Sequence, residues 1–224
     1  RVLFEPYKSS QPGWAEQEPE YFWKSLVQTS KKFFRELPVK KESIKGVSLT
    51  TQRNTMINLD SAGKPLRPAI QWLDRRKAEL GSWPPFYISA ALKALKFYDA
   101  MTYTIMECEA NWIAQNQPEI WEKTYKFLFL SGYLTYRLTG EFTDSAANQV
   151  GYLPFDFKKQ EWAAEKDMKW KMFNSIRKEQ LPQLVKSSET MGFISKKTSI
   201  ETGIPEGLPV FAAATDKACE VLGS

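Results

Sequence analysis

The fold class is decided by residues 203–217, which run Gly-Ile-Pro-Glu-Gly-Leu-Pro-Val-Phe-Ala-Ala-Ala-Thr-Asp-Lys. Glycines and prolines predict a loop at the start of this stretch, and the apolar run from Val210 to Ala214 predicts a buried strand. A helix is expected from Lys217 onward. A strand, a polar step and a helix in this order indicate an α/β domain, whose ligands bind beyond the carboxyl ends of strands.

Asp216 stands at that polar step and is therefore the first candidate site residue. The chain contains no histidine, so a proton-transfer step would fall to a carboxylate, a lysine, a tyrosine or a cysteine. The alternative is structural: Thr215 or Asp216 caps the helix, which both residue types do well. From spacing alone, the cap is favoured.

Apolar spacing and turn residues predict one α/β domain over residues 1–224, without repeats or low-complexity linkers. The expected helices cover residues 19–37, 86–116 with a break near Tyr98 and Asp99, a segment from Pro118, and 134–138. The expected strands cover residues 1–8, 46–51 and 56–60, followed by a turn at 61–64 and an extended segment at 66–72.

Composition excludes several classes of protein. The net charge is +5, but the basic residues come as scattered pairs among acidic ones, which favours a solvated surface over a nucleic-acid interface. No window approaches eighteen uncharged apolar residues, so no membrane helix is expected, and the start does not resemble a signal peptide. Cys108 and Cys219 are too few for a disulfide framework and lack metal-ligand spacing. They indicate a reducing cytoplasm and no structural metal.

Three candidate ligand-binding residues, Gln52, Arg53 and Asn54, lie in a loop between two apolar strands. Almost every residue of the loop carries a side chain that can form hydrogen bonds. Neutral polyhydroxyl ligands need such a mixture of donors and acceptors. The alternative is an ordinary strand connection whose polar groups satisfy their own backbone.

A second candidate segment is Ile-Gln-Trp-Leu-Asp-Arg-Arg at residues 70–76. The indole of Trp72 offers a flat apolar face for a sugar, and Asp74 with the arginines could hold its hydroxyls. The alternative places Trp72 in the core and pairs Asp74 with Arg75. No glycine-rich phosphate loop is visible in the sequence.

Five segments occur in one order along nearly the whole chain. They are Gly-Trp-Ala-Glu-Gln-Glu-Pro-Glu (13–20), Thr-Gln-Arg-Asn-Thr (51–55), Trp-Leu-Asp-Arg-Arg (72–76), Tyr-Leu-Thr-Tyr-Arg-Leu-Thr-Gly (133–140) with Thr-Asp (143–144), and Thr-Gly-Ile-Pro-Glu-Gly-Leu-Pro-Val (202–210) with Asp216. Together they resemble the N-terminal, substrate-binding domain of the FGGY family of carbohydrate kinases.

The resemblance implies an actin-like ATPase, or ribonuclease H-like, α/β fold and ATP-dependent phosphorylation of a sugar or polyol. It implies Asp216 as the catalytic base, substrate contacts from the Arg53 loop, Trp72 and Tyr103, and ATP and Mg²⁺ held mostly by other parts of the protein. It further implies a phosphate-loop hairpin before Arg1 and an ATP-binding domain after Ser224. This chain alone is therefore expected to be an inactive fragment, and a homodimer stays open.

Three departures from the family pattern leave the substrate open. Ala212–Ala214 and Thr215 replace glycines before the aspartate, Gly132 replaces an aspartate, and the segment between Arg76 and Trp112 follows no specified member of the family. The Arg53-Asn54 pair keeps half of the Arg-Glu pair of glycerol kinases and lacks the Met-His of xylulokinases. Two alternatives from other classes remain: a non-catalytic sugar-binding or regulatory module of the same fold, and a basic nucleic-acid binder with strongly salt-dependent affinity.

Overall fold

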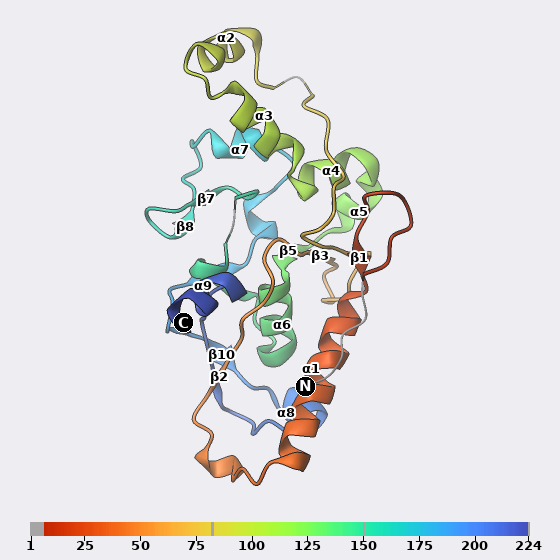
Figure 1. Cartoon of the computed structure of the whole chain (residues 1–224), viewed down its shortest axis with the longest axis vertical. Helices are drawn as coiled ribbons and strands as arrows, with labels where there is room; N and C mark the ends of the chain where they lie inside the picture. The colour runs from red at the N-terminus through yellow and green to blue at the C-terminus, as the bar shows by residue number, and fades with distance from the viewer. Residues whose placement is uncertain (1–6, 82, 150, 224) are drawn as a thin grey trace.

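The central sheet is antiparallel and has the strand order β1 (Glu16–Gln17), β4 (Ala69–Ile70), β3 (Met56–Leu59) and β5 (Lys126–Phe129). It belongs to a computed structural model that describes residues 7–81, 83–149 and 151–223 (Figure 1). Residues 1–6 of the predicted first strand lie outside the described residues. Lys8 forms an isolated bridge with Glu16.

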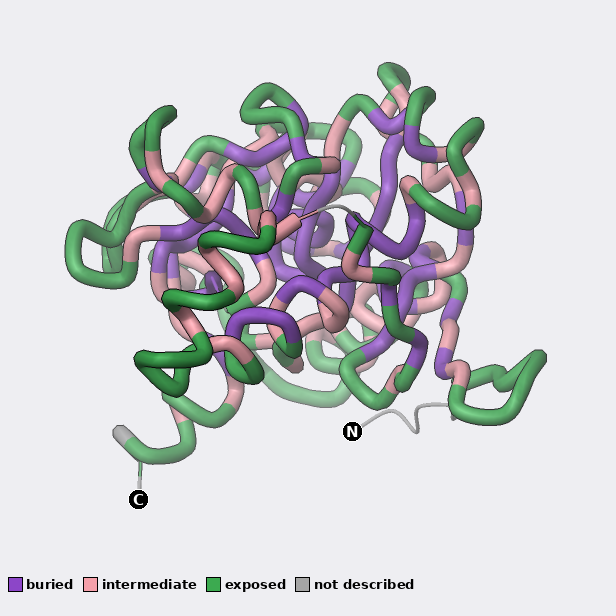
Figure 2. Tube along the Cα trace, turned by 90° about the horizontal axis from the view of Figure 1, so that it is seen from above, coloured by how far each residue is buried: buried purple, intermediate pink, exposed green. Residues whose placement is uncertain are grey.

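Side chains alternate between the two faces along a strand, and both faces of this sheet are covered by apolar residues. Ile57 lies opposite Leu128, and both belong to one apolar core that also contains Phe22 and Trp23 of α1 (Pro19–Glu36). Met56 points to the other face and belongs to a second core. The buried segments accordingly lie in the middle of the molecule and the exposed ones at its rim (Figure 2).

The predicted strand–step–helix is confirmed in a second sheet. Its order is β10 (Thr190–Phe193), β11 (Pro209–Phe211) and β2 (Val47–Ser48), with β11 antiparallel to β10 and parallel to β2. The ladder ends at Phe211, three residues before the predicted end of the strand. The helix α9 (Asp216–Gly223) begins at Asp216, one residue before the predicted start.

The remaining elements surround these two sheets. The remaining helices are α2 (Phe86–Ala94), α3 (Tyr98–Met106), α4 (Glu109–Asn116), α5 (Pro118–Lys123), α6 (Leu130–Thr139), α7 (Lys169–Met172) and α8 (Lys196–Thr202). The remaining strands pair as β6 (Thr143–Ser145) with β9 (Gln183–Val185) and β7 (Phe155–Asp156) with β8 (Glu161–Trp162). In Figure 1, α2 and α3 lie at one end of the long axis, and α1 runs beside α8 toward the other. Among the described helices, none has the length and apolar character needed to span a bilayer.

Two helical predictions need correction. The helix predicted over 86–116 has its expected break slightly earlier, at 95–97 instead of near Tyr98, where Lys96 has a left-handed φ of +59°. It has a second, unpredicted break at 107–108, where Cys108 is extended before α4. The helix predicted for 134–138 begins earlier, at Leu130. Its first turn contains Ser131 and Gly132, which are weak helix formers, so the pattern hid its start.

Gly132 lies in close contact with a buried carboxylate. A Cβ on Gly132 would lie 3.2 Å from Asp144 Oδ2. Asp144 is fully buried and accepts hydrogen bonds from the Ser131 hydroxyl at 2.8 Å, the Ser145 N–H, and the Asn148 and Gln149 amides. Burial raises the pKa of Asp144 to about 6. An aspartate at position 132 would place a second carboxylate beside it.

Two glycines test how tightly the turn after β3 packs. Gly63 and Gly140 both have a left-handed φ, of +74° and +87° respectively. A Cβ on Gly63 would overlap the Tyr136 hydroxyl, whereas a Cβ on Gly140 would have no atom within 4 Å. Gly140→Ala should cost about 1–2 kcal/mol of unfolding free energy from backbone strain. Gly63→Ala should cost about 1–3 kcal/mol more from overpacking. Urea unfolding measures both, and equal losses would contradict the packing seen at Tyr136.

Candidate functional site

A cleft of about 460 Å³ gathers four of the predicted site residues. Asn54 comes from the loop before β3, Trp72 and Asp74 from the segment after β4, and Tyr103 from α3. These segments lie far apart in sequence. Motifs predicted from separate stretches of the chain therefore meet in one place.

Trp72 forms an exposed aromatic face of the cleft. The chain turns directly after β4, and the Asp74 N–H donates to the Gln71 carbonyl at 2.9 Å. This turn places Trp72 at its outer edge, where 54% of the residue is exposed. The alternative that Trp72 belongs to the core is therefore wrong. An exposed indole face can pack on the apolar side of a sugar.

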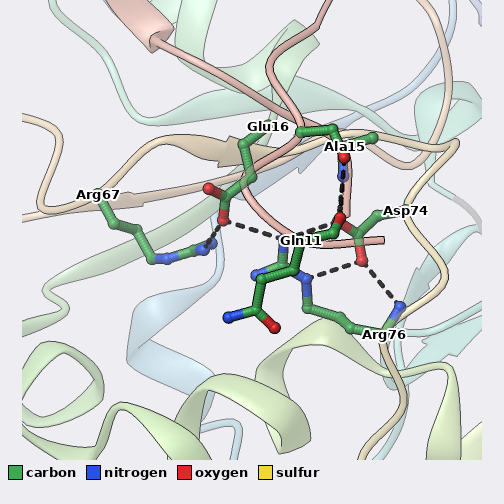
Figure 3. Close-up of polar contacts among 7 residues, drawn as sticks. Gln11, Ala15, Glu16, Arg67, Asp74 and Arg76 are labelled. Atoms are coloured by element: carbon green, nitrogen blue, oxygen red, sulfur yellow. Dashed lines mark hydrogen bonds and ion pairs between the residues drawn. The ribbon is translucent and has the colours of Figure 1, made fainter. Parts of the chain in front are cut away.

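Asp74 is engaged by the protein itself. Its carboxylate accepts the Ala15 N–H at 2.6 Å and, from Arg76, the backbone N–H at 2.9 Å and two guanidinium N–H groups at 2.7 Å each (Figure 3). These four bonds use the acceptor sites that a carboxylate has. The ion pair predicted with Arg75 is instead made with Arg76. A direct contact between Asp74 and a ligand stays a prediction.

The Asp74–Arg76 pair is part of a larger buried network. Arg76 also lies 3.0 Å from Glu16, which pairs in turn with Arg67 (Figure 3). Two carboxylates and two guanidinium groups balance, which buried charges require. Burial lowers the pKa of Arg67 to about 10, a value at which it stays charged at neutral pH.

Arg76 is also enclosed by aromatic rings. Its guanidinium carbon lies 3.9 Å from the Trp14 ring centre and 4.6 Å from that of Trp112, and the two indoles meet edge to face at 5.3 Å. Guanidinium groups bind well over aromatic faces because they are planar and weakly hydrated. Trp112 belongs to α4, so Arg76 joins the cleft wall to that helix.

The opposite wall is formed by α3 and by Tyr152. Lys77 Nζ lies 5.0 Å from the Tyr103 ring centre and 3.0 Å from Glu107. Tyr103 and Tyr152 share a hydrogen bond, and burial raises the pKa of Tyr152 to about 12. The wall thus offers phenol hydroxyl groups and a cation already paired with an acid.

A third part of the cleft pairs Asn54 with Glu109, the first residue of α4. Asn54 Nδ2 donates to Glu109 Oε1 at 2.6 Å. Glu109 is only 8% exposed, and burial raises the pKa of Glu109 to about 8. Its carboxyl is therefore mainly uncharged at neutral pH. Asn54 has a left-handed φ of +52°, which asparagine tolerates better than most residues.

Gln52, Arg53 and Asp216 are not among the residues that line this cleft. The Gln52 amide donates to the Thr55 hydroxyl at 2.8 Å, and Arg53 is exposed toward Lys217. The Asp216 N–H donates to the Thr51 carbonyl at 3.1 Å, so α9 begins beside the loop that carries Asn54.

The comparison with protein families agrees with this architecture. The model of the FGGY family of carbohydrate kinases, N-terminal domain, matches residues 4–223. The chain belongs to this family. Its described fold is the actin-like ATPase, ribonuclease H-like fold of the solved sugar kinases that it resembles.

Three FGGY relatives show the extent of the similarity. The xylulose kinase of Lactococcus lactis is 26% identical and is matched over 94% of this chain and 41% of its own length. The glycerol kinase of Thermococcus onnurineus is 29% identical over 97% of this chain and 43% of its own. The ligand-bound xylulose kinase structure from Lactobacillus acidophilus has a TM-score of 0.76 at 19% identity, over 97% and 43%. The chain thus spans less than half the length of these relatives.

Sequence reasoning missed Arg76 and Glu109 as organisers of this FGGY domain. Neither has a local signal, since an acidic residue in the first turn of a helix ordinarily reflects the helix dipole. The helix break at 107–108 is what brings Glu109 to the cleft, and the break was not predicted. Arg76 adjoins Arg75, and only the fold decides which of the two is buried.

Replacing Arg76 should lower the free energy of unfolding more than replacing Arg75. In Arg76→Met the buried carboxylates of Asp74 and Glu16 lose a partner, which should cost about 3–5 kcal/mol of unfolding free energy. Arg75→Met, at an exposed position, should stay within about 0.5 kcal/mol of wild type. Chemical denaturation compares the two variants. Similar small losses would show that the buried network does not hold the wall.

Glu109 should make stability depend on pH. Its folded pKa is raised above the value of 4.5 for a free side chain, so the folded state keeps a proton that the unfolded state releases. This contribution is complete below about pH 4.5 and is lost as pH rises toward 8. The stability of wild type relative to Glu109→Gln should therefore fall across this range, by at most about 1.4 kcal/mol per pH unit. If the stability difference between wild type and Glu109→Gln is constant or rises with pH, the Glu109 carboxyl is not held neutral by burial.

Proposed function

We propose that this chain is the substrate-binding half of an ATP-dependent sugar or polyol kinase. The observation that supports this most is the cleft. There, the exposed face of Trp72 lies among amide and phenol groups, and the charged side chains Asp74 and Arg76 are already paired with each other. Such a surface suits a neutral ligand with an apolar face and many hydroxyls. We expect the reducing cytoplasm as its compartment.

Within this proposal, the cleft binds and orients the hydroxyl that receives the phosphoryl group. Phosphoryl transfer depends mainly on positioning and electrostatics, and a carboxylate accepts the hydroxyl proton. Trp72, Asn54 and Tyr103 would contact the substrate directly. Gln52 and Arg53 would border it from the loop, and Asp74 would keep the wall in shape.

Asp216 is the proposed base. The Thr51 carbonyl accepts the Asp216 N–H. Thr51 is three residues from Asn54, so at most about 11 Å of chain separates Thr51 from this cleft residue. The competing role is the cap: Asp216 is the first residue of α9, and its Oδ1 accepts the N–H of the next residue, Lys217, at 2.8 Å, which is not the N2 or N3 bond of an N-cap. Closure of a second domain onto this face would determine how close a substrate hydroxyl comes.

ATP would supply the phosphoryl group, as membership of a kinase family implies. The described residues include no group of three or more cysteine, aspartate or glutamate side chains that could hold a metal ion. Nucleotide and metal would be bound chiefly by the part of the relatives' length that this chain does not span.

The substitution Asp216→Asn separates base from cap. Asparagine caps a helix as well as aspartate but is not basic. In the full-length kinase we expect Asp216→Asn to bind sugar nearly normally and to lose about 10²–10⁴ in kcat. The assay measures ATP-dependent phosphorylation of a panel of sugars and polyols, including xylulose and glycerol. Wild-type turnover in a folded variant would leave Asp216 as a cap.

The isolated 224-residue chain should not phosphorylate any member of that panel. It should still hold substrate weakly, at about the millimolar level, because it carries only one side of the closed cleft. Phosphorylation by the isolated chain would contradict the proposal that nucleotide and metal are bound by another part of the protein. Full-length protein that binds sugar without ATP turnover would favour the non-catalytic module instead.

A further inference from the structure

The contact between Asn54 and Glu109 joins two segments that are 55 residues apart in sequence. One is the loop before β3, the other the start of α4. The loop ends at Thr55, whose carbonyl accepts the Leu130 N–H at 2.9 Å, so its far side is held by α6. On the cleft side, Glu109 is the side chain that holds it.

Asn54 is held in a conformation that the chain does not favour by itself. Its left-handed φ of +52° is an uncommon backbone state for a residue with a side chain. Such a state persists where surrounding contacts fix it. The side chain of Asn54 donates a 2.6 Å hydrogen bond to Glu109, and this bond determines which way the amide faces.

The other end of that amide is unused. Asn54 Oδ1 is buried and has no hydrogen-bond partner within the described residues. Buried polar atoms are seldom left unpaired in folded proteins, and exceptions often mark a place for a ligand or water. Asn54 lines the cleft, so a ligand hydroxyl that displaces the atoms covering this oxygen would be a donor that fits it.

The groups around Glu109 favour an uncharged ligand here. Glu107 is paired with Lys77, and Asp74 is paired with Arg76. Burial raises the pKa of Tyr152 and that of the Cys108 thiol to about 12, so both groups are neutral at physiological pH. A carboxyl that is itself mainly protonated adds little charge to this part of the cleft.

We propose that Glu109 is a specificity-determining residue of the cleft: it holds the Asn54 amide so that Asn54 Oδ1 accepts a hydrogen bond from a hydroxyl of a neutral polyol or ketose. This inference rests on the proposed function and assigns a residue to substrate selection. Glu109 acts through Asn54, so it is a positioning residue.

The test compares variants of this chain for binding of glycerol and D-xylulose, titrated by ligand-dependent NMR shifts. Glu109→Met keeps the side-chain length without an acceptor and should weaken binding about tenfold, the loss expected for one hydrogen bond. Glu109→Gln keeps an oxygen that accepts from Asn54 and should bind within about twofold of wild type. Glu119→Gln is the control: it removes an exposed acid of α5 that does not line the cleft, and binding should not change.

A second readout uses the wild-type chain and so does not depend on a variant folding. The side-chain amide resonances of Asn54 should shift as glycerol or D-xylulose binds, and the shift should persist in Glu109→Gln. Asn54→Ala should weaken binding as much as Glu109→Met, and the double variant no further, because both act through one contact.

Two results would overturn the inference, and they differ in what else they reject. If wild type binds either ligand but Glu109→Met binds equally well, or the Asn54 amide does not respond, Glu109 does not position the substrate contact and the proposed function still stands. If wild type binds no member of the sugar and polyol panel at concentrations far above the millimolar range, the proposed function and this inference both fail.

Discussion

The buried pairing of Asp74 with Arg76 is the contact on which the cleft depends. It satisfies the carboxylate completely, ties the turn after β4 to Ala15, and extends through Glu16 to a second arginine (Figure 3). A charged group can be buried in this way only when its partner is buried with it. Trp14 and Trp112 pack on Arg76 and shield the ion pair from water, and Trp112 connects the pair to α4.

The chemistry of the cleft follows from this arrangement. Because Asp74 is held inward, Trp72 two residues earlier is turned outward with an exposed face. Because α4 packs against Arg76, its first residue, Glu109, reaches the Asn54 loop. Asp74, Arg76, Lys77 and Glu107 are paired within the wall, and what faces a ligand is aromatic, amide and hydroxyl groups together with the exposed Arg75. We propose that this pairing of the wall charges suits the cleft to a neutral sugar or polyol.

Much of the fold could be predicted, because it follows from local patterns. Helix α1 and strand β3 are marked by proline and by apolar spacing, and the step at Asp216 by a strand that ends before a helix. The gathering of Asn54 and Trp72 in one cleft could be expected only from the order of the motifs. The choice of Arg76 over its neighbour, and the break that places Glu109, depend on tertiary packing. Neither leaves a trace in periodicity or composition.

The most direct measurement is a crystal structure of this chain with D-xylulose or glycerol bound. We expect the ligand in the cleft, with its carbon face on the Trp72 ring and a hydroxyl within hydrogen-bond distance of Asn54 Oδ1. The Asp74–Arg76 pair should be unchanged, since it is part of the protein's own structure. A ligand bound outside this cleft, or bound there only after Asp74 has left Arg76, would contradict our explanation of the site.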